Sequence, residues 1–148
     1  MNTYKTGLDL TQESPRSPRL LVGGFAILGR TIDKCRALIW GKIGEYHFDC
    51  PLDNQLFTFM GVKGGDFKAY VAEGHSDEEI TNWVKKNGAK KTETEIAGWN
   101  EMVSANNYSS QPREKKAWLE GENNRLGLDK DGTLFDFLDA DDKASFKK

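Results

Sequence analysis

Residues 28–43 read Leu-Gly-Arg-Thr-Ile-Asp-Lys-Cys-Arg-Ala-Leu-Ile-Trp-Gly-Lys-Ile, and this stretch decides the fold. Its apolar residues recur at steps of four, three, four and four positions, at Leu28, Ile32, Cys35, Ile39 and Ile43. This spacing places them on one face of an amphipathic helix, with charged residues between them. Glycine is typical of the end of a helix, and Gly41 and Gly44 lie near the end of the stretch. We therefore predict a helix that ends at these glycines.

The chain beyond this helix carries the signals of several shorter helices. Ser76 is followed by Glu79, and Thr92 by Glu95, which is the capping-box pattern of a helix start. Other predicted starts depend on a single aspartate cap or a proline, namely Asp49 with Pro51, Asp66, and Pro112. Residues 45–50 instead alternate between polar and apolar, which predicts one short extended segment.

These elements predict the fold class and the domain organisation. We expect an all-α or nearly all-α protein, a compact multi-helix bundle of short helices with at most one short extended segment. The 148 residues suit one domain, and 37% of them are hydrophobic, which suffices for a core. Residues 1–13 offer little to bury beyond Leu8 and Leu10. We therefore expect a loosely ordered N-terminal arm at 1–13, followed by a single helical domain at 14–148.

The composition argues against several classes of protein. A formal net charge of −2 gives no basic excess that would attract nucleic acid, so we expect no nucleic-acid partner. No apolar run approaches the roughly 20 residues of a membrane span, and the polar start lacks an export signal. We therefore expect a cytoplasmic protein without a membrane partner, in which Cys35 and Cys50 are reduced thiols.

The segment 14–42 is the most distinctive one for function because it is basic. The segment contains one anionic residue, Asp33, and six cationic ones, namely Arg16, Arg19, Arg30, Lys34, Arg36 and Lys42. Two glycines precede the first helix, where free backbone N–H groups and the helix dipole favour an anion. One interpretation is a site for a phosphate or carboxylate, built from Arg16, Arg19, Gly23, Gly24 and Arg30. Its glycine spacing is not that of a recognised phosphate-binding loop.

The alternative interpretation is that these arginines stabilise the fold, which is the commoner use of such residues. The chain offers a partner for them, because residues 129–142 hold six aspartates against Lys130. We hypothesise that this acidic segment docks on the basic one and neutralises it. Replacement of Arg16 and Arg19 with alanine would then lower the stability of the protein at low salt.

A second candidate cluster lies within the predicted extended segment and consists of Glu45, His47, Asp49 and Cys50. A thiolate nucleophile with a histidine base, or half of a metal site, is its functional interpretation. In an extended segment His47 and Cys50 point to opposite faces, which argues against the nucleophile. The alternative is a buried Cys50 and a surface or hydrogen-bonded His47. We predict neither a metal nor a cofactor.

Three groups of short strings, taken in order, resemble a known family. They are Asp9-Leu10-Thr11 before Pro15-Arg16-Ser17-Pro18-Arg19, Leu28-Gly29-Arg30 running into Ile32-Asp33-Lys34-Cys35-Arg36-Ala37, and Gly44-Glu45-Tyr46-His47 leading to Cys50-Pro51-Leu52-Asp53. In order and spacing they resemble the small bacterial family catalogued as domain of unknown function DUF5069, most closely over residues 8–62. The closing Leu138-Asp139-Ala140-Asp141-Asp142-Lys143 also fits. The resemblance implies a single-domain protein and carries over no activity, cofactor or catalytic residue.

Taken together, the residues lead us to expect a non-catalytic intracellular binding or interaction protein that recognises a small anion or an acidic segment. Such a protein could also form a homo-oligomer. The alternative is an enzyme that acts on a phosphorylated or carboxylated metabolite. In that case the arginines bind the substrate, and the acid or base is Glu45, His47, Asp49 or Asp33. An enzyme requires the arginines and His47 to converge in one pocket, and a binding protein does not.

Overall fold

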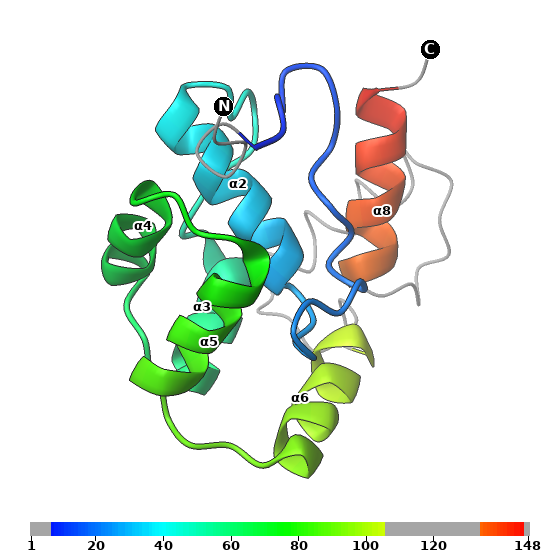
Figure 1. The fold of residues 1–148 in the computed structure, drawn as a ribbon. Coiled ribbons are helices and arrows are strands. Elements are labelled where there is room, and N and C mark those ends of the chain that lie inside the picture. Colours follow the sequence, from blue (N-terminus) through cyan, green and yellow to red (C-terminus); the bar gives the residue numbers. More distant parts are fainter. Residues whose placement is uncertain (1–6, 106–133, 147–148) are drawn as a thin grey trace.

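The computed structural model describes residues 7–105 and 134–146 and shows a helical protein (Figure 1). Its helices are α2 (Leu28–Trp40), α3 (Pro51–Met60), α4 (Gly64–Ala72), α5 (Asp77–Asn87), α6 (Glu93–Ala105) and α8 (Leu134–Ser145). Within the described residues, the only β-type pairing is an isolated bridge between Val22 and Phe25. The prediction of an all-α fold is confirmed. The helix predicted after Pro112 lies outside the described residues.

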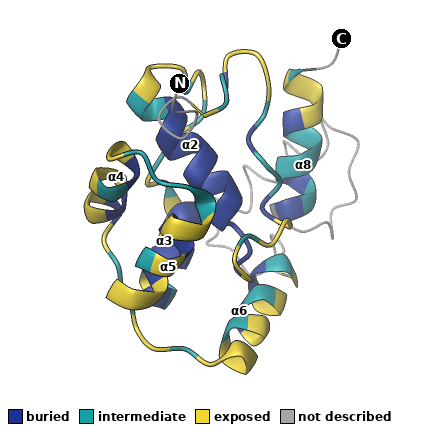
Figure 2. Cartoon of the chain, viewed as in Figure 1, coloured by how far each residue is buried: buried dark blue, intermediate teal, exposed yellow. Residues whose placement is uncertain are grey.

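Helix α2 lies at the centre of the molecule. Figure 1 shows α3, α4 and α5 on one side of it and α8 on the other, and Figure 2 shows α2 buried along most of its length. Every residue from Leu28 to Ala37 is buried, including four charged ones. Because a buried charge is costly without a partner, each charged residue of α2 must be neutralised by the elements around it.

The apolar core between α2 and its neighbouring helices is rich in aromatic side chains. The ring centroids of Phe57 and Phe67 lie 5.2 Å apart, and Phe48 lies 6.1 Å from each of them. Trp99 of α6 stacks on Phe59 of α3 at 4.9 Å. Aromatic pairs at these distances stabilise a core beyond the area that they bury. They fix α3, α4 and α6 relative to one another.

Several predicted helix ends are confirmed. In the capping box of Ser76 and Glu79 the two reciprocal hydrogen bonds are 2.9 and 3.1 Å long, and in that of Thr92 and Glu95 both are 3.1 Å. Gly41 closes α2 in the left-handed conformation, with φ of 80°. This glycine ends the helix three residues earlier than the last residue of the apolar repeat, because a left-handed residue turns the chain out of the helix.

Two predicted caps are wrong. The N-cap residue of α3 is Cys50 rather than Asp49, and the N-cap residue of α4 is Lys63 rather than Asp66, which lies in the first turn. Asp49 instead approaches the start of α4, where a Cβ on Gly64 would lie 2.6 Å from its Oδ1 atom. A carboxylate near a helix N-terminus is favourable, and the close approach requires glycine at that position.

Residues 45–50 form turns rather than the predicted extended segment. Asp49 has a φ of 61°, in the left-handed region, far from the φ of regular β-strands. The predicted alternation in exposure still holds. Tyr46, Phe48 and Cys50 are partly buried, whereas the three polar residues between and before them are exposed. The alternating pattern therefore identified the inward side chains correctly but not the backbone that presents them.

The described part of the chain before α2, residues 7–27, is referred to below as the N-terminal segment. Leu10 is 1% exposed, and its backbone N–H donates to the carbonyl of Lys42 (2.8 Å). The N–H of Ile27 donates to the carbonyl of Pro18 (2.8 Å). The described part of the predicted loose arm is therefore attached to the body, because Leu10 finds a buried position that the sequence pattern does not indicate.

Candidate functional site

Ion pairs tie the N-terminal segment to α2 and α5. Arg16 places Nε 3.0 Å from Asp33 Oδ2 and Nη1 2.9 Å from Asp77 Oδ2. Arg36 of α2 reaches the same Asp77 (3.0 Å) and donates to the backbone carbonyl of His75 (2.9 Å). Burial opposes the charge of Arg16, but the hydrogen bonds to Asp77 and Asp33 outweigh burial and hold the pKa of Arg16 above its usual value.

A second set of ion pairs holds α8 against the N-terminal segment. The Nε atom of Arg19 lies 2.9 Å from Asp139 Oδ2, and its Nη2 atom binds Asp136. The hydroxyl of Ser17 donates to Asp139 (2.6 Å). The hypothesis that the acidic C-terminal segment docks on the basic one is therefore confirmed for Arg19. It is wrong for Arg16, whose partners lie on α2 and α5.

The third set is the most deeply buried and joins α2 to α8. Arg30 binds both carboxylate oxygens of Asp142, at 2.7 and 3.2 Å, and the two side chains are 4% and 9% exposed. The hydroxyl of Tyr46 donates to Asp142 (2.8 Å), and Arg30 lies 5.4 Å from the centroid of the Tyr46 ring. Burial raises the pKa of Tyr46, and the hydrogen bond to Asp142 raises it further. This phenol therefore keeps its proton at neutral pH.

The two cysteines lie in different surroundings. Lys34, 3% exposed, binds Asp53 (3.0 Å), and its Nζ atom also lies 3.2 Å from the partly exposed Cys50 Sγ. The same Asp53 accepts a hydrogen bond from the hydroxyl of Thr31 (2.7 Å). Cys35 is buried in the core, where burial raises the pKa of its thiol to about 12. Cys35 is therefore a small core residue, whereas Cys50 is partly exposed and contacts the ammonium group of the buried Lys34.

The five residues of the predicted anion site do not present a common set of donors. The three arginines bind aspartates of α2, α5 and α8, as described above. A Cβ on Gly23 would lie 2.1 Å from Thr81 Cγ2 of α5. The carbonyl of Gly24 accepts from Asn100 Nδ2 of α6 (2.7 Å), and the N–H of Ala26 donates to Asn100 Oδ1 (2.9 Å). The turn before α2 is therefore held by side chains of two other helices.

The four residues of the second candidate cluster have different surroundings in the structure. His47 is exposed, and Asp49 Oδ1 accepts a hydrogen bond from the side chain of Asn54 (3.1 Å). Cys50 contacts the buried lysine described above, and Glu45 lines a cavity. Within residues 7–105 and 134–146, no group of three or more His, Cys, Asp or Glu side chains could hold a metal ion.

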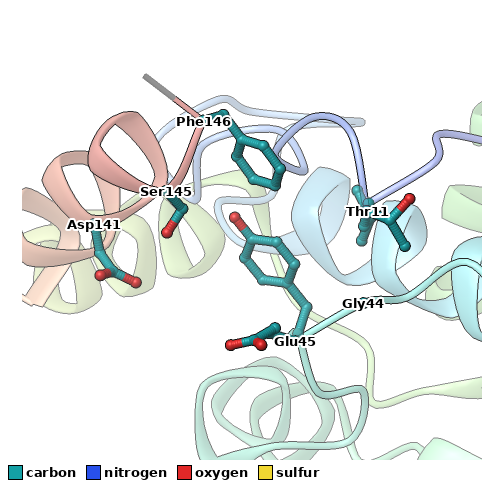
Figure 3. A pocket seen from close by; sticks show the side chains of 8 residues that line it. Thr11, Gly44, Glu45, Asp141, Ser145 and Phe146 are labelled. Atoms are coloured by element: carbon teal, nitrogen blue, oxygen red, sulfur yellow. The ribbon is translucent and has the colours of Figure 1, made fainter. Parts of the chain in front are cut away.

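That cavity lies where the N-terminal segment, the turn after α2 and α8 meet, and its volume is about 760 Å³. It is lined by Leu10, Thr11, Gly44, Glu45, Tyr46, Asp141, Ser145 and Phe146. We refer to it as the α8 cavity. Figure 3 shows the carboxylates of Glu45 and Asp141 at one side of this space and Thr11 at the other.

Sequence reasoning found only part of this cavity. It singled out Glu45, and the docking of the acidic segment placed Asp141 near the N-terminal segment. Thr11 was marked only as part of a family string, and nothing in the sequence marked Ser145 or Phe146, because an isolated hydroxyl or ring carries no spacing pattern. Their positions follow from the ion pairs that bring the two ends of the described chain together.

The fold and the site define a small all-α protein with a central helix whose buried charges are paired from several sides, and with a polar cavity beside its last helix. The chain belongs to the family described as domain of unknown function (DUF5069), whose family model matches residues 12–144. The resemblance seen in the sequence is therefore confirmed. Among curated proteins, none matches the chain. None of the helices in the described ranges is long and apolar enough to cross a membrane.

Proposed function

We propose that this protein is a non-catalytic cytoplasmic binding protein whose ligand occupies the α8 cavity. The observation that carries the proposal is the construction of the cavity. Three segments far apart in the sequence meet there, and the Arg30–Asp142 ion pair and its hydrogen bond to Tyr46 fix two of its walls relative to α2. A volume of about 760 Å³ falls within the range of small-molecule sites. A preformed cavity avoids the cost of ordering its walls when a ligand binds.

The residues of the cavity favour binding over catalysis. Of the candidate acids, bases and nucleophiles, only Glu45 is among the described residues that line it. An enzyme for a phosphorylated or carboxylated metabolite would need cationic groups at the reacting end of its substrate. Arg16, Arg19 and Arg30 are instead bound to aspartates, and none of them lines the cavity. Among the residues that the structure describes, this arrangement supports binding more than the enzyme alternative.

The recognition of a small anion at Gly23–Gly24 stays a prediction. Such an anion would have to displace an aspartate from Arg16 or Arg19, because both guanidinium groups have carboxylate partners. The half-exposed Arg19 is the more accessible of the two, with 43% of its side chain exposed. Phosphate, sulfate and dicarboxylates therefore belong in the same ligand screen, with Arg19→Ala as the variant that abolishes their effect.

A homo-oligomer is a further proposal. Large apolar side chains are exposed at Leu20, Leu21, Trp40 and Met102, where they could contact a second copy of the chain. Light scattering coupled to size exclusion measures the mass in solution. A dimer that dissociates in a Leu20→Asp, Leu21→Asp variant supports this proposal, and a monomer at all concentrations contradicts it.

A thermal-shift screen against a library of metabolites tests the cavity itself. A ligand that binds only the native state raises the melting temperature. In the variant Ser145→Trp an indole fills the cavity, and in the matched control Thr94→Trp the same side chain is placed on the exposed face of α6. We expect a compound whose shift is lost in Ser145→Trp and kept in Thr94→Trp. The proposal fails if no compound raises the melting temperature of the protein. It also fails if every such increase is still seen in the Ser145→Trp variant.

A further inference from the structure

A thiol and an amine from two different elements are in contact in this structure. The Nζ atom of Lys34, in α2, donates to the Sγ atom of Cys50, the N-cap residue of α3 (3.2 Å). The two residues are 16 positions apart in the chain, so the packing of α3 against α2 brings them together. Both side chains carry a nucleophilic atom, and oxidation of the sulfur turns it into an electrophile that the nitrogen can attack. The pair is therefore a candidate for covalent modification.

The lysine is held in position for this contact. Its side chain is 3% exposed, although a lysine usually keeps its ammonium group in water. Asp53 Oδ1 lies 3.0 Å from Nζ of Lys34. The same carboxylate accepts hydrogen bonds from the hydroxyl of Thr31 (2.7 Å) and from the N–H of Asp49 (2.9 Å), which fix its orientation. The ammonium group therefore stays beside the sulfur instead of rotating into solvent.

The sulfur is the atom of this pair that an oxidant attacks first. Cys50 is partly exposed, so a small oxidant reaches it, whereas Cys35 is buried in the core. Thiols react with peroxides as thiolates, and reactive thiols are typically found beside a cation or a helix N-terminus. Cys50 has both of these neighbours, in Lys34 and in the start of α3.

We propose that Cys50 and Lys34 form a reversible, oxidation-dependent cross-link between α2 and α3, with hydrogen peroxide or an organic hydroperoxide as the oxidant. In the first step the sulfur of Cys50 attacks one peroxide oxygen and the O–O bond breaks. The sulfur becomes a sulfenic acid, and the thiol proton leaves on the second oxygen as water or an alcohol. The sulfur is oxidised by two electrons, and the peroxide is reduced by two.

The second step is a condensation, which needs no further oxidant. Lys34 gives one proton to the carboxylate of Asp53, and the lone pair of Nζ attacks the sulfur of Cys50. An S–N bond forms, the S–O bond breaks, and the departing hydroxide takes a second proton from the nitrogen and leaves as water. Sulfenic acids condense in the same way with a backbone nitrogen. The product is a sulfenamide between the two side chains.

The cross-link has two consequences for the protein. It traps the sulfenic acid before a second peroxide can oxidise it irreversibly to sulfinic acid. It also closes a loop between α2 and α3, which reduces the number of conformations of the unfolded chain and so stabilises the folded one. Thiol reductants cleave the S–N bond and regenerate both side chains. The pair thus protects Cys50 and tightens the core under oxidising conditions.

Mass spectrometry after treatment of the native protein with hydrogen peroxide tests the proposal. Trypsin cannot cleave after a cross-linked Lys34, so we expect a peptide that joins residues 31–36 to residues 43–63. Its mass should lie two hydrogen atoms below the sum of the separate peptides, and dithiothreitol should abolish it. We also expect the melting temperature of the oxidised protein to rise by about 5 °C or more, and dithiothreitol to reverse this rise.

Two variants and a chemical trap supply the controls. Cys50→Ser keeps a hydrogen-bond acceptor beside Lys34 but has no sulfur, so it should show neither the joined peptide nor the rise in melting temperature. Cys35→Ala should keep both, which excludes a disulfide as their source. Dimedone, which reacts with sulfenic acids, should label Cys50 and suppress the joined peptide when it is added with the peroxide. The trap needs no replacement of the buried lysine.

The proposal is overturned if peroxide converts Cys50 to sulfinic acid without any joined peptide, because the contact is then only a structural hydrogen bond. A joined peptide that is absent from Cys35→Ala overturns it as well. A joined peptide that retains one oxygen atom, or that forms equally well in the presence of dimedone, contradicts the sulfenamide.

Discussion

The charged residues of this protein differ in how much they contribute to the stability of the fold, because some of them are buried and others are exposed. Arg30 and Asp142 are almost fully buried, whereas the side chains of Arg19 and Asp136 are 43% and 45% exposed. A buried ion pair that loses one partner leaves an uncompensated charge in a medium of low polarity. An exposed pair loses only a weak interaction that water already screens.

The variant Asp142→Asn should therefore lower the free energy of unfolding by about 3 kcal/mol or more, because Arg30 stays charged and buried without a counterion. Asp136→Asn, on the same helix, should lower it by less than about 1 kcal/mol. Urea denaturation at neutral pH measures both values. Equal losses in the two variants would contradict the larger contribution to stability that we assign to the buried pair.

The two thiols should differ in their rate of alkylation. Cys50 is partly exposed, lies at the start of α3, and contacts the ammonium group of Lys34, whereas Cys35 is buried. Thiols that react fast are exposed and lie beside a positive charge or a helix N-terminus. Brief treatment of the native protein with iodoacetamide should label Cys50 and leave Cys35 unlabelled until urea is added. Peptide mass spectrometry reads both positions, and early labelling of Cys35 would show that the core opens at α2.

At the scale of the element, the start of α2 depends on the turn before it. Ile27, the N-cap residue, has a φ of 73° and no side-chain cap, which is uncommon for a β-branched residue. Its N–H donates to the carbonyl of Pro18, and Thr81 of α5 and Asn100 of α6 contact the turn that precedes it. The turn is therefore determined by packing against α5 and α6 rather than by the cap residue itself.

The two glycines of this turn make a matched pair for a stability test. Both have positive φ, so alanine at either position should cost about 1–2 kcal/mol in backbone strain. Only Gly23 also approaches Thr81, where a Cβ would lie 2.1 Å from Cγ2, whereas nothing lies within 4 Å of a Cβ on Gly24. Gly23→Ala should therefore lose about 1–3 kcal/mol more than Gly24→Ala.

The additional loss at Gly23 should be smaller when Thr81 is replaced by alanine, because the clashing methyl and hydroxyl groups are then absent. A double-mutant cycle of Gly23→Ala with Thr81→Ala, followed by urea denaturation, measures this coupling. Additive losses would show that the two residues do not contact each other as the structure has them.

The helices could be predicted to the extent that their signals are local. The boxes of Ser76 and Thr92 depend on residues three positions apart, and both are formed as predicted. Asp49 and Asp66 carry the same kind of signal in weaker form, and tertiary contacts overrode it. Asp49 approaches Gly64 of the next helix, and two glycines let α4 begin before Asp66. Capping residues thus predict helix starts best when two of them act reciprocally.

At the scale of the whole molecule, three sets of ion pairs join the N-terminal segment, α2, α5 and α8, and the Lys34–Asp53 pair joins α2 to α3. Overall charge balance predicted that the acidic and basic segments would meet, which is true of Arg19 and Arg30. It could not predict that Arg16 would form ion pairs with Asp33 and Asp77, since every aspartate carries the same charge and only packing distinguishes them. For the same reason the α8 cavity appears only once the helices are in place.

The ion pairs of Asp77 with Arg16 and Arg36 predict how the stability of the protein depends on pH. Burial opposes the charge of Asp77, but its hydrogen bond with Arg16 and the charges of Arg16 and Arg36 outweigh this and hold its pKa below the usual value. A lowered carboxyl pKa stabilises the folded protein above the unfolded value of about 4, and this stability is lost as pH falls through the folded pKa. Asp77→Asn should therefore lose less stability between about pH 6 and pH 3 than the wild type.

Urea denaturation at both pH values measures this difference. At neutral pH the variant should already be less stable than the wild type, because Arg16 and Arg36 both lose the carboxylate that they share. Curves for the two proteins that run parallel with pH would show that Asp77 does not contribute to the acid response.

The buried pair between α2 and α8 also sets an order of events during protein synthesis. Arg30 and Asp142 are separated by 112 positions in the chain. At typical translation rates of about 5–20 residues per second, roughly 6–22 s pass between the synthesis of the two residues. During that interval the nascent central helix carries a cation whose counterion does not yet exist, so it cannot be stably enclosed. A copy that stops short of the last helix therefore keeps its core open to proteases, and only completed chains become resistant.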